Sequence, residues 1–396
     1  MNDHKTPIDE MIGLDSQILS AQLHELSERL FPPSAEKELR TFSSAEAAAL
    51  IGITDSYIRQ LAKNDDGIIP PKKANGRREF TLPQIHDLRR YLARSKPQYL
   101  PNRTTSQKLQ TIAVTNFKGG SGKTTTAIHL AQYLALRGYR VLALDLDPQA
   151  SMSAMLGCQP EFDVSEDQTI YGAIKYDEDR VPIKEVIRKT YFAGLDFIPA
   201  DLELQEFEQD TPMHLASTDR DPRNLFFMRI AEALKQVEED YDVVVIDCPP
   251  QLGYLTLAAL SAATSVLITI HPQMLDVASM SQFLNMTSNL LRVVREAGGN
   301  LDYGWMSYLI TRHEPNDGPQ AQVAAFLRSL FSDRVLTATM LKSTAVSDSG
   351  LSNQTLYETR PETMHRRTYD RAVEAMNSVN EEIEKRIRQT WERSES

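Results

Sequence analysis

Apolar residues recur with two different periods along the chain. From Thr111 onward, short apolar runs that suit buried strands alternate with longer segments in which apolar positions recur every three or four residues, as on one face of a helix. The predicted strands are 111–116, 140–145, 241–247, 265–270, 303–311 and 334–339. This alternation predicts an α/β domain over residues 110–396, in which a mostly parallel, doubly wound sheet is covered by helices on both faces.

The first 109 residues carry a different pattern. Leu19, Leu23, Leu26 and Leu30 follow the a/d spacing of a heptad, so residues 1–38 are predicted to contain an amphipathic helix. Its apolar stripe needs a partner, either the chain's own body or the same helix of a second subunit, which makes it a candidate dimerisation element. Residues 97–109 are polar, contain proline and lack a period, which predicts a linker.

Residues 39–96 predict a small α-helical domain. Ser43 and Glu46 have the spacing of a capping box that opens one helix, Gly52 ends it, and Thr54 precedes a second helix. Two short helices joined by a glycine-containing turn are typical of a helix-turn-helix. Asn75-Gly76 then predicts a hairpin, and a closing helix follows from about residue 83 to residue 92. The segment resembles the winged helix-turn-helix of MerR-like DNA-binding domains.

A winged helix-turn-helix inserts its second helix into the major groove of DNA and places its wing on phosphates. The predicted DNA-binding residues are Ser56, Tyr57 and Arg59 on that helix, and Lys72, Lys73, Arg77 and Arg78 on the wing. A small helical protein-interaction domain is the alternative. The dense positive charge of the wing favours DNA.

The charge of the chain is unevenly distributed. The net charge is −11, but residues 40–108 contain 13 Lys/Arg and 6 Asp/Glu, so this segment is +7 and the remainder is −18. A basic module on an acidic body indicates contact with a polyanion at one chosen place. Two cysteines fit a reducing cytosol, and the absence of a long apolar run predicts a cytoplasmic protein with no membrane span.

The strongest chemical motif is "NFKGGSGKTT" at residues 116–125, which follows a predicted strand and opens a predicted helix. Glycines let backbone N–H groups close around phosphate oxygens, and the helix N-terminus adds its dipole. In a phosphate loop of this kind, the lysine before the threonines binds the β- and γ-phosphates and the next hydroxyl binds Mg²⁺. The predicted nucleotide-binding residues are Lys118, Gly119, Gly120, Ser121, Gly122, Lys123, Thr124 and Thr125, with Thr124 on Mg²⁺.

This loop departs from the ordinary pattern because Phe117 stands where a glycine is usual and an additional lysine, Lys118, follows it. Lys118 has no role in an ordinary phosphate loop. A cation at the start of the loop can reach the nucleotide of a neighbouring subunit, as an arginine finger delivered in trans does. We therefore predict that ATP, and not ADP, joins two subunits face to face.

With these residues the chain resembles the ParA/MinD group of P-loop ATPases, whose hallmark is the lysine-containing deviant Walker A motif. "LALDLDPQAS" (142–151), "VVVIDCPPQLG" (243–253) and "LITIHPQMLDVASMSQFL" (267–284) resemble further motifs of ParA-type partition proteins. The resemblance covers residues 110–385. Together with the helix-turn-helix, it is similar to the longer ParA class, which includes the RepA proteins of plasmid replication-partition cassettes.

The resemblance implies an Mg²⁺-dependent ATPase with slow turnover. Asp147 would orient the attacking water, which makes it catalytic together with Lys118 and Lys123, and Asp247 would hold Mg²⁺ through water. Asp145 competes with Asp147 for the catalytic role, because strand alternation places both on one side. Carboxylates are also the ligands that Mg²⁺ prefers on chemical grounds.

The resemblance also implies partners. These are a second copy of the chain, nonspecific DNA, an operator that the protein represses, and a ParB-type centromere-binding protein, all at the nucleoid. Arg312 is the candidate for nonspecific DNA binding on the ATPase domain, with Lys342 as a second candidate. Two other functions remain open: a nucleotide-sensing repressor with negligible turnover, and a MinD-like ATPase that cycles on membranes. The second is disfavoured because residues 371–396 carry five basic and six acidic residues, so the apolar face of this predicted helix suits core packing.

Overall fold

The computed structural model describes residues 7–30, 37–63, 67–216, 225–360 and 363–395 and divides the chain into two compact units, residues 1–38 and 39–396. The first unit contains one helix, α1 (Ile8–Leu30), on which Ile12 and Leu19 are exposed. The side chains of Leu23, Leu26 and Leu30 lie outside the described part, so three of the four leucines of the predicted heptad stripe have no structural description.

The second unit is built on a seven-stranded sheet with the order β5-β6-β4-β7-β3-β8-β9. Its strands are β3 (Gln110–Thr115), β4 (Val141–Asp145), β5 (Arg188–Lys189), β6 (Leu195–Ile198), β7 (Val243–Asp247), β8 (Ser265–Ile270) and β9 (Trp305–Ile310). All neighbours pair in parallel except β5 and β6. The predicted doubly wound α/β fold is confirmed, and β3 lies in the interior of the sheet.

One predicted strand is wrong. Residues 334–339 contain the end of a 3₁₀ turn, η4 (Ser332–Arg334), and then a segment that follows β9 without forming a ladder. Val335 makes a single bridge to Tyr308, and the N–H groups of Leu336 and Met340 donate to Tyr308 and Ile310. These widely spaced hydrogen bonds give partners to two backbone carbonyls of the edge strand β9 without forming a regular eighth strand.

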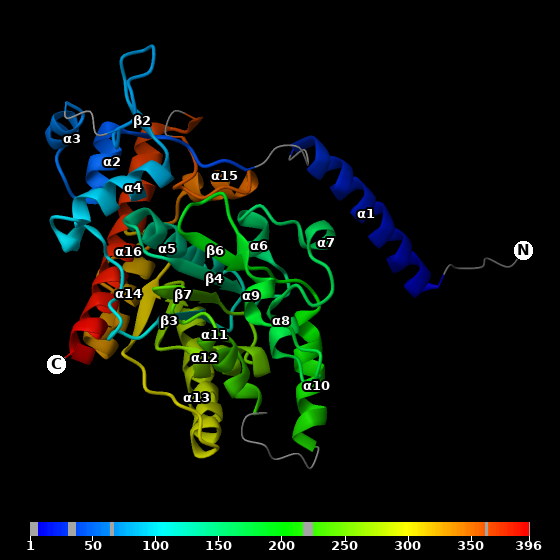
Figure 1. Cartoon of the computed structure of the whole chain (residues 1–396). Coiled ribbons are helices and arrows are strands. Elements are labelled where there is room, and N and C mark those ends of the chain that lie inside the picture. Colours follow the sequence, from blue (N-terminus) through cyan, green and yellow to red (C-terminus); the bar gives the residue numbers. More distant parts are fainter. Residues whose placement is uncertain (1–6, 31–36, 64–66, 217–224, 361–362, 396) are drawn as a thin grey trace, which may run out of the picture. The chain divides into compact units, whose positions relative to one another are not determined.

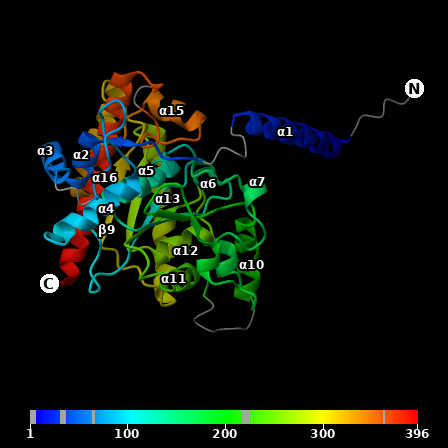
Figure 2. The same ribbon diagram turned by 45° about the horizontal axis from the view of Figure 1, so that its top comes forward.

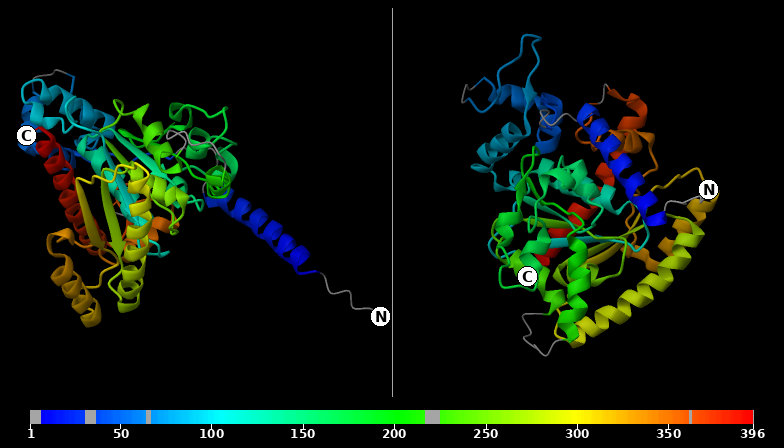
Figure 3. Two further views of the ribbon diagram at one scale, coloured as in Figure 1. Left: turned by 90° about the horizontal axis from the view of Figure 1, so that it is seen from below. Right: turned by 90° about the vertical axis from the view of Figure 1, so that its right-hand side faces the viewer.

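Helices cover both faces of the sheet, with α16 on one face and α13 on the other (Figure 1; Figure 3, left). The helices of the nucleotide domain are α5 (Lys123–Arg137), α6 (Ser151–Met155), α7 (Pro160–Asp163), α8 (Ile170–Ile174), α9 (Ile183–Val186), α10 (Leu204–Ala216), η3 (Phe226–Met228), α11 (Arg229–Lys235), α12 (Tyr254–Ala262), α13 (Met274–Glu296), α14 (Gly318–Phe331), α15 (Thr344–Leu351) and α16 (Arg366–Glu395). The apolar face of α16 is buried in the hydrophobic core that it shares with α5, as the balanced charge of this helix predicted. The buried residues on that face are Met376, Val379, Ile383, Ile387 and Trp391.

The N-terminal part of the second unit consists of α2 (Ser44–Ile51), α3 (Asp55–Leu61) and α4 (Leu82–Ala93), with a two-stranded ladder of β1 (Phe42–Ser43) and β2 (Glu79–Phe80). Ser43 and Glu46 form the predicted capping box. Gly52 ends α2 with φ +83°, a left-handed conformation that glycine adopts without strain. Before β2, residues 73–77 make a tight turn in which the Lys73 N–H donates to the Arg77 carbonyl at 2.8 Å.

These helices share one continuous core with the nucleotide domain, on the face of the sheet covered by α5 and α16 (Figure 2). His86 of α4 lies 2.9 Å from the carbonyl of Ala135 in α5, and the Arg89 guanidinium donates to the carbonyl of Leu50. Both side chains therefore bond to backbone near the C-terminal ends of α5 and α2. The helical module is packed onto the helix that follows the phosphate loop.

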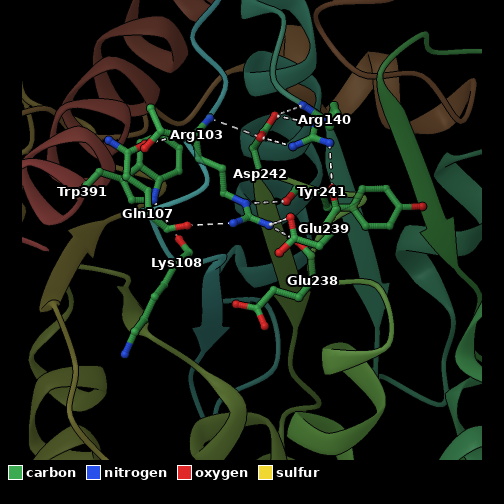
Figure 4. Close-up of polar contacts among 10 residues, drawn as sticks. Arg103, Gln107, Lys108, Arg140, Glu238, Glu239, Tyr241, Asp242 and Trp391 are labelled. Atoms are coloured by element: carbon green, nitrogen blue, oxygen red, sulfur yellow. Dashed lines mark hydrogen bonds and ion pairs between the residues drawn. The ribbon is translucent and has the colours of Figure 1, made fainter. Parts of the chain in front are cut away.

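The predicted linker is also held against the body. It begins with a 3₁₀ turn, η1 (Pro97–Tyr99), and Arg103 then donates to the carbonyl of Tyr241 at 3.0 Å while its N–H donates to Asp242 (Figure 4). The indole N–H of Trp391 donates to the carbonyl of Lys108 at 2.9 Å. Side chains that satisfy several backbone carbonyls at once fix the path of the segment up to β3.

Candidate nucleotide site

The phosphate loop joins the end of β3 to the start of α5, in the strand–loop–helix context that its sequence predicts. Gly120 and Gly122 have φ +72° and +82°, so this path suits glycine. A Cβ at Gly122 would lie only 3.4 Å from Thr311. The amide of Asn116 donates to the carbonyl of Thr269 at 2.6 Å and its oxygen accepts from the Lys118 N–H at 3.1 Å. The loop is therefore fixed at both ends by its neighbours.

Lys123 lies inside the curve of the loop. Its side chain is buried, and its ammonium donates to the carbonyl of Lys118 at 3.2 Å. Burial lowers the pKa of Lys123, while the charges of Asp247 and Asp147 oppose that shift. A cation in this position can bind a phosphate oxygen that enters the loop.

Two carboxylic acids lie side by side at the ends of the adjacent strands β4 and β7. Asp145 ends β4, Asp247 ends β7, and the two residues are register partners in the parallel ladder, both fully buried. Asp145 accepts hydrogen bonds from the Ser153 N–H at 2.9 Å and from the Ser153 hydroxyl at 2.8 Å. Its other oxygen accepts from the Asp147 N–H at 3.2 Å. Asp145 is thus a satisfied group that shapes the turn after β4.

Asp247 is the unusual member of the pair. Within the described part of the chain, neither of its carboxylate oxygens has a hydrogen-bond partner. Burial, and after it the charge of Asp145, raises the pKa of Asp247 well above its usual value. Thr124 and Lys123 lie near enough to favour the ionised form, yet neither donates to it with normal geometry. A buried carboxylate without donors is costly, and a divalent cation bound there would offset the cost.

Asp147 lies two residues beyond Asp145 and is partly exposed. One of its oxygens accepts from the Gln149 N–H at 3.0 Å. Its charge is felt by both Lys123 and Asp247. The two acids, which strand alternation could not distinguish, thus differ in their surroundings. Asp145 is buried and hydrogen-bonded, whereas Asp147 lies at the border of the site and is accessible to solvent.

Lys118 does not point at its own loop. Its ammonium forms an ion pair with Asp276 in the first turn of α13, and the imidazole of His271 lies 3.4 Å from the other oxygen of Asp276. The side chain of Lys118 is 47 % exposed, whereas that of Asp276 is 9 % exposed. Burial, followed by the nearby Arg312 charge, lowers the pKa of His271. The motifs did not single out Asp276 or His271, although both lie in the stretch 267–284.

Arg312 also lies at the loop. Its guanidinium donates to the carbonyl of Gly120 at 3.1 Å, and the preceding Thr311 donates its hydroxyl to the carbonyl of Ser121 at 2.7 Å. Arg312 has φ +51°, a left-handed conformation that is rare for an arginine. The other basic candidate of this region, Lys342, is paired with Glu314 at 2.9 Å.

The seven N-terminal residues predicted to contact DNA lie on α3 and in the turn before β2, at one end of the second unit (Figure 1). Most of these side chains are exposed, and four have intramolecular partners. Arg59 pairs with Asp55, Lys73 pairs with Glu79 at 2.6 Å, Arg78 donates to the carbonyl of Pro70, and the Ser56 hydroxyl lies 2.9 Å from that of Thr54. The exposed residues of the set are Ser56, Tyr57, Arg59, Lys72, Lys73 and Arg77, and Arg78 is half-buried. None of them lies at the phosphate loop.

A phosphate loop that follows an inner parallel strand, with acids at the ends of the two successive strands on one side of it, β7 and β4, defines a P-loop nucleotide-binding α/β protein. The sequence profile described as an AAA domain matches residues 109–297. A replication protein A of Rhizobium rhizogenes is 55 % identical over 378 residues, which cover 95 % of this chain and 93 % of the relative. The chromosome partitioning protein ParA of Myxococcus xanthus is 33 % identical over 237 residues, which cover 60 % of this chain and 77 % of the relative.

Among solved structures, one described as a partition protein superposes with a TM-score of 0.65 at 18 % identity, and covers 95 % of this chain and 99 % of that one. At this identity the match supports the fold. The sequence relatives carry the assignment: the chain belongs to the ParA-type family of partition ATPases, as the motif "KGGSGKTT" predicted.

Proposed function

We propose that this protein is a partition ATPase that binds Mg²⁺-ATP in the loop 118–125, dimerises on ATP, and hydrolyses it slowly. The single observation that supports the hydrolytic site best is the orphaned carboxylate of Asp247, buried opposite Lys123 at the mouth of the loop. Asp247, through water, and the Thr124 hydroxyl would hold Mg²⁺. When bound, this ion would neutralise charge that develops on the phosphate oxygens.

Asp147 is our choice for the residue that orients the attacking water. Its carboxylate borders the loop and reaches solvent, while that of Asp145 is occupied by Ser153 and the Asp147 N–H. Lys123 would hold the transferred phosphate. Asp147→Ala should reduce turnover about 100-fold or more while nucleotide binding persists, because positioning of a base or water contributes this much. The matched control is Asp145→Asn, which should lower stability more than it alters the chemistry.

Dimerisation would place Lys118 of each subunit on the phosphates of the partner's nucleotide. The exposed, outward side chain of Lys118 supports this role, since only its contact with Asp276 must be exchanged. Sedimentation of one preparation in the apo, ADP and ATP states tests it. The expected result is a dimer with ATP alone, and a monomer in all three states for Lys118→Ala.

The N-terminal module would bind the operator of the protein's own operon through α3 and the basic turn, and the loaded dimer would bind nucleoid DNA without sequence preference. A ParB-type protein would stimulate turnover. The competing function, a nucleotide sensor with negligible hydrolysis, predicts that ATP turnover stays at background with both DNA and partner present. No helix in the described residues combines the length and the apolar character needed to cross a bilayer. The MinD-like alternative has less support because the apolar face of α16 is already covered by core residues.

A further inference from the structure

Arg312 lies on a segment of the chain that is fixed on both sides. Thr311 extends the sheet, because its N–H donates to the carbonyl of Ile270 at 2.8 Å, and its hydroxyl is bonded to the phosphate loop. On the other side, the N–H of His313 donates to the carbonyl of Met340 at 2.9 Å. The residue between these two anchors is forced into the left-handed region at φ +51°. An arginine in this conformation costs on the order of 1 kcal/mol.

The left-handed conformation of Arg312 matters because it directs the guanidinium toward the phosphate loop. The Arg312 guanidinium reaches the carbonyl of Gly120 across the loop, and one of its nitrogens would lie 3.6 Å from a Cβ built on that glycine. A guanidinium has five N–H donors in a planar fork, so a single carbonyl leaves most of them available to an anion.

No acid neutralises this guanidinium within the part of the chain that the structure describes, whereas Lys118 and Lys342 each have a carboxylate partner. Arg312 also contributes to the lowered pKa of the neighbouring His271, so its charge acts on the mouth of the loop. An exposed arginine held by strain and turned toward a phosphate loop suits an anionic ligand.

We propose that Arg312 is a nucleotide-binding residue, which contacts the polyphosphate of the ATP held in its own subunit's loop. This rests on the proposed function, because the ligand is the nucleotide that the loop is proposed to bind. It replaces, for this residue, the sequence-based prediction of nonspecific DNA binding. The side chain that DNA would need is directed at Gly120, on the loop itself.

The test is equilibrium binding of a fluorescent ATP analogue to the full-length protein with Mg²⁺. Arg312→Gly is the informative variant, because glycine accepts φ +51° and removes only the guanidinium. Losing a charge-assisted contact should weaken binding about 10-fold or more. Arg312→Lys, which keeps the charge, should recover part of that loss. Lys235→Ala, which removes a cation paired with Glu232 on α11, is the control and should bind the analogue as the wild type does.

Three outcomes are distinguishable. Weakened nucleotide binding in Arg312→Gly, with an unchanged melting temperature and with nonspecific DNA binding intact at saturating ATP, supports the proposal. Wild-type affinity for the analogue in Arg312→Gly, with or without a loss of DNA binding, overturns it. If wild-type protein itself does not bind the analogue and Lys123→Ala changes nothing, the proposed function fails and the inference about Arg312 fails with it.

Discussion

The ammonium of Lys118, the residue that distinguishes this phosphate loop, is bound to the carboxylate of Asp276 at the start of α13. Asp276 lies in the first helical turn, where the helix dipole favours a negative charge, and it also contacts His271. A lysine held in its own subunit must leave this partner before it can serve a neighbouring nucleotide. In the proposed dimer, Asp276 would therefore compete with the phosphates of the second subunit's nucleotide for this one cation.

Neutralising Asp276 should favour the ATP-bound dimer. Partly exposed ion pairs contribute up to about 1 kcal/mol, so Asp276→Asn is expected to lower the ATP concentration needed for half-maximal dimerisation about 2- to 5-fold. Sedimentation or light scattering during an ATP titration measures this. Glu296→Gln, at the far end of the same helix, is the control. A midpoint that does not move in Asp276→Asn, or that moves equally in Lys118→Ala/Asp276→Asn, would exclude competition by this pair.

The Asp247 carboxylate should lower the stability of the nucleotide-free protein while being required for ATP turnover. Replacing an unsatisfied buried carboxylate with an amide removes a desolvated charge, so Asp247→Asn is expected to raise the free energy of unfolding of the nucleotide-free protein by about 1–3 kcal/mol. The same change should abolish Mg²⁺-dependent turnover. Urea denaturation without Mg²⁺, compared with ATPase assays across Mg²⁺ concentrations, measures both. A variant that loses stability without Mg²⁺ would show that Asp247 has a protein partner in solution.

One buried histidine, His129, and one half-buried histidine, His86, should make the protein acid-sensitive. His129 lies 2.7 Å from the Thr125 carbonyl and accepts a hydrogen bond from the Leu356 N–H, and burial lowers its pKa to about 4. Burial lowers the pKa of His86 to about 4 as well. The unfolded chain, with histidine pKa 6.5, takes up protons first, so stability is complete above pH 6.5 and falls as the pH drops toward 4. Each histidine should lower the free energy of unfolding at pH 5 by up to about 2 kcal/mol relative to its value above pH 6.5.

This acid sensitivity is checked by urea midpoints at pH 7 and pH 5. His129→Gln should be less stable than the wild type at pH 7 but should lose less on acidification, roughly half of the wild-type loss. His365→Gln changes an exposed histidine and should leave the pH dependence as it is. An equal loss between pH 7 and pH 5 in wild type and His129→Gln would contradict the assignment.

The sequence predicted the parts of this structure that carry strong local signals. The strands β3, β4, β7, β8 and β9 are apolar runs bounded by turn residues, and the phosphate loop is a glycine pattern between a strand and a helix. The four-residue β6 was missed because so short a run has no period to measure. The segment 334–339 was overpredicted because β-forming residues there pair only at intervals with an edge strand.

The same limit applies to the site. Lys118, Lys123, Asp147 and Asp247 could be found from motifs, since each stands in a recognisable stretch. The partner of Lys118 is 158 residues away, and the contact of Arg312 with Gly120 spans 192 residues. Contacts between residues so far apart in the sequence cannot be predicted from the local sequence around either residue. The hydrogen bonds of the two acids could not be predicted either. Ser153 bonds to Asp145, and not to Asp247, because its hydroxyl lies beside Asp145 once β4 and α6 have folded.

The basic turn before β2 should control DNA binding without touching hydrolysis. Lys72 and Arg77 are exposed, and among the described residues neither forms an ion pair, so phosphates can bind them at little cost. Replacing both with alanine should weaken operator binding and reduce the slope of log K against log salt by about 2, because each phosphate contact contributes about 1. Titrations at several salt concentrations measure the slope. Lys235→Ala, which removes a cation paired with Glu232 on α11, should leave the slope as it is. An unchanged slope in the double variant would move the DNA-binding surface away from this turn and favour the protein-interaction alternative for residues 39–96.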